Sequence, residues 1–251
     1  MGSNRRMDHM TWPEFKEVKT HPVIVPIGST EQHGQHLPIG TDAVLATRVA
    51  EDLAERIDGT VLPTLSYGYK SKPLSGGGPL FPGTIDMNGV TVITQMHDVL
   101  SELIADGFTK IVVMNAHLKR GVHRRGHRPG HPRNRGSGHH RGNQLVGPGS
   151  AVGYRQGIRW IGVPRLGIGA CGRHRTSLML HYAPELVHMD RMVEEAGATA
   201  KSYVRYPVRQ GDVPAHGGLA NPAGSSAERG RLIAEACVDA VAEICVEEFA
   251  E

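Results

Sequence analysis

The chain has 251 residues, enough for one large α/β domain but too few for two of generous size. Its formal net charge of +3 is unevenly distributed: residues 118–175 contain 12 Arg, 1 Lys and no Asp or Glu, which leaves 15 basic and 25 acidic side chains for the rest. Short apolar runs, the lack of a signal-peptide pattern and three cysteines without a CxxC pair argue against a membrane span, secretion and a thiolate metal site, so we expect a soluble cytoplasmic protein.

Outside residues 118–175 the sequence predicts strands that alternate with helices. We interpret residues 1–10 as a leader or tag and residues 11–251 as a single domain. Strands are expected at 22–26, 60–63 and 110–115. Helices are expected from Thr41, which would cap the first one, to Ile57, from Asn88 to Gly107, and after a capping box formed by Ser225 and Glu228. This alternation predicts an α/β fold, a three-layer sandwich with a mainly parallel sheet covered by helices.

Metal-ligand side chains follow two of the predicted strands. Glu31 and His33 come after the first strand, with Asp42 at the start of the next helix, and His117 comes after the third strand. Carboxylate and imidazole ligands without thiolates suit a catalytic Zn²⁺ or Mn²⁺ site. For His36 we expect a supporting position behind the ligands. The alternative is that all of these are solvated loop residues, but their gathering at neighbouring strand ends favours a metal site.

Two stretches carry the predicted ligands: residues 26–42 (PIGSTEQHGQHLPIGTD) and residues 114–117 (MNAH). They resemble the first and second metal motifs of the creatininase family. Residues 67–84, which include three adjacent glycines, and residues 176–187, which begin TSLML, resemble two further segments. The resemblance covers residues 11–117 and 176–250.

The resemblance implies a creatininase-like fold and a binuclear Zn²⁺ or Mn²⁺ site that activates water to attack the lactam carbonyl of creatinine, giving creatine. It implies that Glu31, Asp42 and His117 hold one ion, that His33 and a bridging Asp42 hold the other, and that Ser75 contacts the substrate. The expected partner is therefore a small cyclic amide. Family members form closed homohexamers, so a homo-oligomer is also implied.

The resemblance stops at residue 118. The family continues with an aromatic residue and a glutamate that completes the second metal site, whereas this chain has Leu118 and Lys119, and an ammonium group cannot bind a cation. A Trp, a catalytic His and a Glu that precede TSLM in the family are also missing here. The catalytic residue that donates a proton is therefore unassigned.

We interpret residues 118–175 as a reading-frame shift. When each adjacent residue pair is read one base downstream from Lys119, the pairs from His123 onward permit an amphipathic helix. The pairs from Leu166 to Cys171 permit Trp, Glu and His, and the pair of Arg175 with Thr176 permits Glu. We expect disorder or poor packing across 118–173 and, for the chain as written, reduced or absent catalysis with partial metal binding.

Two other functions remain open. Related members of the superfamily act on other amides, including formamides and peptide-derived substrates, and only the residues around Tyr67–Ser71 favour creatinine. The basic segment could instead bind nucleic acid through phosphates. Only Tyr154 and Trp160 within it could stack on bases, and both lie away from its densest Arg and His run, which argues against nucleic acid as a partner.

Overall fold

The computed structural model describes residues 5–70, 80–117, 172–194, 209 and 211–250, together with the backbone of residues 158–159. The elements in these ranges are α1 (Trp12–Glu17), β1 (Val23–Ile27), α2 (Thr41–Ile57), β2 (Thr60–Val61), α3 (Gly89–Ala105), β3 (Ile111–Asn115), β4 (Ile158–Arg159), α5 (Arg173–Tyr182) and α6 (Ala227–Phe249). Short 3₁₀ helices occur at Met7–His9 (η1), Pro184–Leu186 (η4) and Met189–Arg191 (η5). No helix within these ranges is both long enough and apolar enough to span a membrane.

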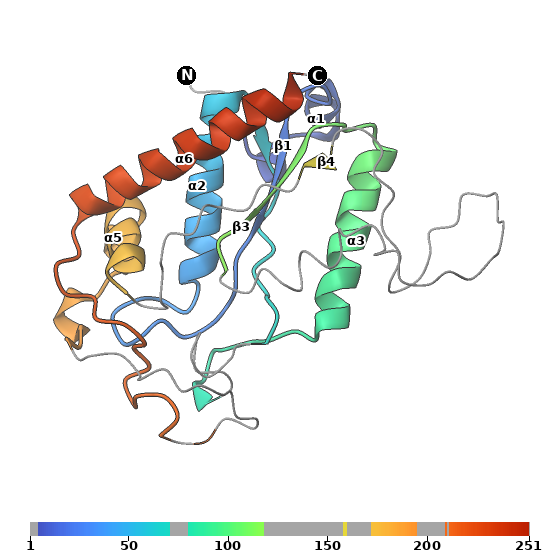
Figure 1. The fold of residues 1–251 in the computed structure, drawn as a ribbon. Helices are drawn as coiled ribbons and strands as arrows, with labels where there is room; N and C mark the ends of the chain where they lie inside the picture. The colour runs from blue at the N-terminus through green and yellow to red at the C-terminus, as the bar shows by residue number, and fades with distance from the viewer. Residues whose placement is uncertain are drawn as a thin grey trace, which may run out of the picture.

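The described strands form an open parallel sheet in the order β2-β1-β3-β4. Every residue of β1 and β3 is buried, as expected for strands covered on both faces. Side chains that alternate along β1 and β3 pack against two different groups of helices. Figure 1 shows α2 and α6 on one side of the sheet and α3 on the other. The predicted three-layer α/β fold is thus confirmed.

One face of the sheet packs on α2 and α6, and the other packs on α3. Ile24 and Met114 contact the apolar sides of α2 and α6, which include Leu53 and Val241. On the opposite face, alternate residues of β1 and β3 pack with Met96, Leu100 and Leu103 of α3. Each helix therefore presents an apolar stripe to the sheet, as its sequence period predicts.

Helix α5 lies beside α2 and α6 at one end of the molecule (Figure 1). Leu178 and Met179 of α5 pack with Leu45 of α2 and Ala234 of α6 in a third apolar cluster. The hydroxyl of Tyr182 at the end of α5 donates a hydrogen bond to Asp52 of α2. These contacts hold α5 against α2 and α6.

Two helix starts differ from the prediction. Gly40 occupies the capping position of α2, and Thr41 is the first helical residue, its hydroxyl donating to the carbonyl of Pro38. In α6 the cap is Ser226, whose hydroxyl accepts a hydrogen bond from the backbone N–H of Arg229, so the predicted capping box, which began one residue earlier, was wrong. Both corrections move a boundary by one residue and leave the helices in place.

Part of the expected leader contacts the domain. Arg6 forms a β-bridge with Val61, and Met7 packs against the apolar cluster around α3. Arg5 forms an ion pair with Asp58, which lies just past the end of α2. These contacts make residues 5–7 part of the packed structure.

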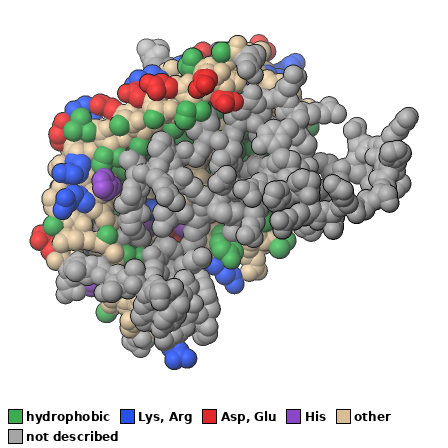
Figure 2. Space-filling view, in the orientation of Figure 1, with side chains coloured by type: hydrophobic (Ala, Val, Ile, Leu, Met, Phe, Trp, Pro, Cys, Tyr) green, Lys and Arg blue, Asp and Glu red, His purple; other side chains and the backbone are tan. Residues whose placement is uncertain are grey.

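Most of the basic segment lies outside the described residues, so its predicted disorder remains a prediction. Residues 158–159 form β4, which pairs with Ile111 and Val112 of β3, so this part has a place in the sheet that the prediction did not include. Helix α6 has an outer surface of mixed character. Figure 2 shows acidic and hydrophobic side chains interspersed over α6, where Leu232 and Val246 are more than half exposed.

Candidate metal centre

The structure brings the four predicted ligand residues together at the carboxyl end of the sheet. Glu31 and His33 lie in the loop that follows β1, Asp42 lies in the first turn of α2, and His117 lies two residues past β3. Each of these four residues is at most 1% exposed. Side chains from separate segments meet here because parallel strands deliver their following loops to one edge of the sheet.

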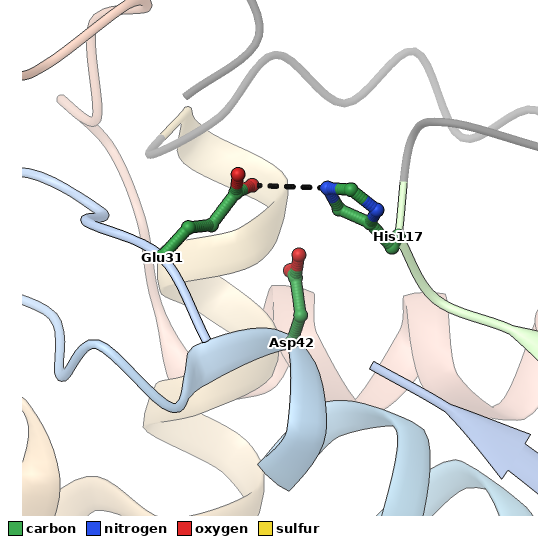
Figure 3. A group of neighbouring side chains, drawn as sticks. All are labelled: Glu31, Asp42 and His117. Atoms are coloured by element: carbon green, nitrogen blue, oxygen red, sulfur yellow. Dashed lines mark ion pairs between the residues drawn. The ribbon is translucent and has the colours of Figure 1, made fainter. Parts of the chain in front are cut away.

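Glu31, Asp42 and His117 point toward a common centre (Figure 3). Each offers one ligand atom, and these atoms all lie within 4.8 Å of one another. The Nε2 atom of His117 is 3.4 Å from Oε1 of Glu31, and among the described residues neither ring nitrogen of His117 has a hydrogen-bond partner. A buried imidazole whose ring nitrogens lack hydrogen-bond partners is costly unless a cation joins it to the neighbouring carboxylates. The triad therefore fits a Zn²⁺ or Mn²⁺ ion.

Asp42 has a favourable electrostatic position for a carboxylate. It is the second residue of α2, where unpaired backbone N–H groups and the helix dipole favour negative charge. Glu31 is held by its backbone, whose N–H donates to the carbonyl of Ile39 at 3.0 Å. The two carboxylates thus come from backbone segments that are themselves fixed.

His33 lies beside the triad with a defined tautomer. Its Nδ1 atom is 2.9 Å from the carbonyl oxygen of Glu31, which can only accept, so Nδ1 carries the proton and Nε2 carries the lone pair. Nε2 is 3.2 Å from Oδ1 of Asp42. Burial, with a further contribution from the positive charge of Arg175, lowers the pKa of His33 to about 3, so its ring is neutral near pH 7.

The fifth polar side chain at this place is Arg175, which the sequence reasoning did not assign to the site. It lies in the first turn of α5, is 3% exposed, and forms an ion pair with Asp42. Its Nη1 atom is 2.6 Å from Nε2 of His33. Burial lowers the pKa of Arg175 to about 10, which still leaves the guanidinium charged at neutral pH. One feature of the sequence points to this residue. Arg175 is the last residue before TSLM, and at this position the shifted reading frame permits Glu.

Further polar contacts hold the ligand loops. The side-chain oxygen of Asn115 accepts a hydrogen bond from the backbone N–H of His117 at 2.8 Å. The side-chain amide of Gln32 donates to the carbonyl of Gly217. His36 is buried outside the triad, and its Nε2 is 2.9 Å from the hydroxyl of Thr176. Its expected supporting role behind the ligands remains a prediction.

Three residues that the family resemblance places at or next to the site lie outside the described residues. Ser75, the expected substrate contact, is one of them. Leu118 and Lys119, which replace the family's aromatic residue and glutamate, are the others. Their predicted roles remain predictions.

Comparison with known proteins supports the resemblance. The model of the creatininase family, described as creatinine amidohydrolase, matches residues 8–125 and 171–245. The unmatched interval falls inside the basic segment. The creatinine amidohydrolase of Pseudomonas putida is 30% identical over 96% of this chain and 95% of its own length. A mycofactocin precursor peptide peptidase of Mycobacterium ulcerans is 29% identical over 91% of this chain and 83% of its own length.

Solved creatininase structures share the fold. A manganese form superposes with a TM-score of 0.80 at 29% identity and covers 99% of this chain and 100% of the other. A mutant of the Zn-Zn type superposes with a TM-score of 0.79 at 28% identity and covers 100% of both chains. A Zn²⁺ or Mn²⁺ centre, expected from the donor set, agrees with these forms. The fold, the donor set and the match of the family model over both parts of the sequence place this chain in the creatininase family.

Proposed function

We propose that this protein is a metal-dependent amide hydrolase whose substrate is creatinine and whose product is creatine. The observation that carries the proposal is the buried triad of Glu31, Asp42 and His117 at the carboxyl end of the parallel sheet. Family membership makes the chain a creatininase-type hydrolase. The choice of creatinine rests on the greater coverage of the Pseudomonas enzyme and on the residues around Tyr67–Ser71.

In this proposal Glu31, Asp42 and His117 would hold the ion, which when bound would activate a water and polarise the carbonyl of the amide. The chain's own residues prepare the site. Asn115 fixes the backbone of His117, and Asp42 lies in the first turn of α2, where the helix dipole favours a negative charge. Burial of all three ligands excludes bulk water, which strengthens each electrostatic contact.

A peptide is the second candidate substrate. The mycobacterial relative, which is named for cleaving a precursor peptide, has nearly the same identity to this chain as the creatinine amidohydrolase. The two substrates share an amide carbonyl but differ in size. Parallel assays with creatinine and with short peptides separate them.

We further propose that residues 118–175 are encoded one base out of frame, and that the chain as written has lost much of its activity. The family model fails to match between residues 125 and 171, within the acid-free segment. Loss of a general acid alone lowers a hydrolytic rate by about 10²- to 10⁴-fold.

A hexameric assembly, by analogy with the family, belongs to the same proposal and is tested by light scattering of the purified protein.

The experiment compares two proteins made from synthetic genes. One is the chain as written, with Lys119 verified by peptide mass, and the other reads residues 118–175 one base downstream. With Mn²⁺ or Zn²⁺ supplied, we expect the restored chain to hydrolyse creatinine and the chain as written to be at least about 100-fold slower. Equal rates would overturn the frame-shift proposal. A restored chain that cleaves peptides but not creatinine would overturn the choice of substrate.

A further inference from the structure

The place between His33 and Asp42 is filled by a cation that belongs to the protein. The guanidinium of Arg175 reaches it from α5, forms an ion pair with Asp42 and lies 2.6 Å from Nε2 of His33. All three side chains are buried. By the family resemblance, this is the position at which His33 and the bridging Asp42 would hold a second metal ion.

The tautomer of His33 requires a cation or a donor at this place. Its Nδ1–H donates to the carbonyl of Glu31, so its lone pair on Nε2 faces the carboxylate oxygen of Asp42 at 3.2 Å. Two acceptors at that separation repel each other unless a donor or a cation lies between them. Nη1 of Arg175 supplies that cation, because it forms an ion pair with Asp42 and lies 2.6 Å from Nε2 of His33.

Charge balance also limits the site to one metal ion. The described carboxylates of the centre are Glu31 and Asp42, and one guanidinium together with one divalent ion already exceeds their combined negative charge. A second divalent ion would lie against the guanidinium in a buried environment where screening is weak. It would also need the lone pair of His33 that Arg175 now occupies.

We propose that the guanidinium of Arg175 takes the place of the second metal ion, so that this chain binds one divalent ion, at Glu31, Asp42 and His117. The inference rests on the metal centre of the proposed function and adds its stoichiometry. It makes His33 a partner of Arg175 and not a metal ligand in this chain. Replacing Arg175 with a carboxylate should open the second position.

The test counts metal ions by equilibrium dialysis against Mn²⁺ followed by elemental analysis, and records the electron paramagnetic resonance of the loaded protein. We expect one equivalent and an uncoupled spectrum for the parent chain, and two equivalents with a spin-coupled spectrum for Arg175→Glu. Arg175→Gln, which keeps a neutral donor, controls for the loss of charge. Arg173→Gln is the matched control, since Arg173 lies in the same turn of α5 but is exposed, and it should bind one equivalent. Circular dichroism verifies that each variant is folded.

His33→Ala supplies a second readout. In the parent chain it should leave the first Mn²⁺ bound with an affinity changed less than about threefold, because His33 contacts Arg175. In the Arg175→Glu background it should remove the second equivalent.

Two bound ions with a spin-coupled spectrum in the parent chain would overturn this inference and leave the proposed metal centre standing. A single equivalent in both folded Arg175→Glu and folded Arg175→Gln would show that Arg175 does not stand in for a metal, and would also overturn it. Two other results would instead overturn the proposed metal centre itself. One is that the parent chain binds no ion, and the other is that Glu31→Gln leaves the affinity for the bound ion unchanged.

Discussion

The contact between Gly28 and the start of α2 offers a direct test of how the fold positions Asp42. Gly28 follows β1, and a Cβ atom built on it would lie 2.5 Å from Cα of Ala43, 2.6 Å from the nitrogen of Ala43 and 2.8 Å from the carbonyl carbon of Asp42. All three are backbone atoms of α2, so no side chain can rotate away. An ordinary contact begins at 3.4 Å, so Gly28→Ala must push the first turn of α2 outward by about 1 Å.

The expected cost of Gly28→Ala combines strain with a smaller gain. Inserting a methyl group into a packed interior costs about 1–3 kcal/mol, while the reduced freedom of the unfolded chain returns about 0.4–1 kcal/mol. We therefore expect the free energy of unfolding, measured in urea without metal, to fall by about 1–2 kcal/mol. Because Asp42 moves with the helix, the affinity for Mn²⁺ should fall by about 10- to 100-fold, the effect typical of disturbing the support of a ligand.

Gly40→Ala is the matched control, since Gly40 borders the same helix and a Cβ atom there meets nothing within 4 Å. Its cost should be limited to the weaker capping preference of alanine, about 1 kcal/mol or less, with Mn²⁺ affinity unchanged. If Gly28→Ala matched its parent in both urea midpoint and Mn²⁺ affinity, the contact between β1 and α2 would not be what positions Asp42.

Two further predictions concern Tyr182 and the two cysteines of α6, which lie away from the metal centre. Tyr182→Phe removes the hydrogen bond to the carboxylate of Asp52, which joins α5 to α2, and should lower the free energy of unfolding by about 1–2 kcal/mol in urea melts; an unchanged midpoint would contradict this. Burial raises the pKa of Cys237 to about 11 and that of Cys245 to about 12, so in a Cys171→Ser background neither thiol should react with Ellman's reagent at pH 8 until the protein unfolds. Above pH 9 the unfolded thiols ionise while the native ones keep their protons, so stability should fall with rising pH, by about 1.4 kcal/mol per pH unit for each thiol up to pH 11. Equal labelling of folded and unfolded protein at pH 8, or a flat pH profile, would contradict the predicted burial.

The layers and most element boundaries follow from local sequence. The helix predicted to follow a cap at Thr41 ends at Ile57 as expected, because its apolar period and the residues that follow it agree on where it ends; its cap lies one residue earlier, at Gly40. The cap of α6 was misplaced by one residue because Ser225 and Ser226 are equally good caps. In the structure Ser226 is the one that caps, and its backbone N–H is 3.2 Å from the hydroxyl of Ser177, a contact with α5 that local sequence does not reveal.

The triad could also be expected from sequence, because Glu31, Asp42 and His117 follow strand ends that a parallel sheet brings together. Arg175 could not. It lies 142 residues from His33 along the chain, on a helix whose sequence is not strongly amphipathic, and it enters the site only because α5 packs against α2 and α6. The segment around Arg175 is basic and has no acidic residues, and this composition predicts that its side chains are exposed to solvent. Its burial depends on Asp42, a partner that tertiary packing alone supplies.

The most direct test of the metal centre is anomalous diffraction from crystals grown with Zn²⁺, measured above and below the zinc edge. The fold and the donor set predict a strong anomalous peak enclosed by the carboxylates of Glu31 and Asp42 and the imidazole of His117. Arg175 at its present position predicts no second peak between His33 and Asp42. A map with no peak at the triad, or with its strongest peak elsewhere on the protein, would contradict the assignment of this site as the metal centre of the enzyme.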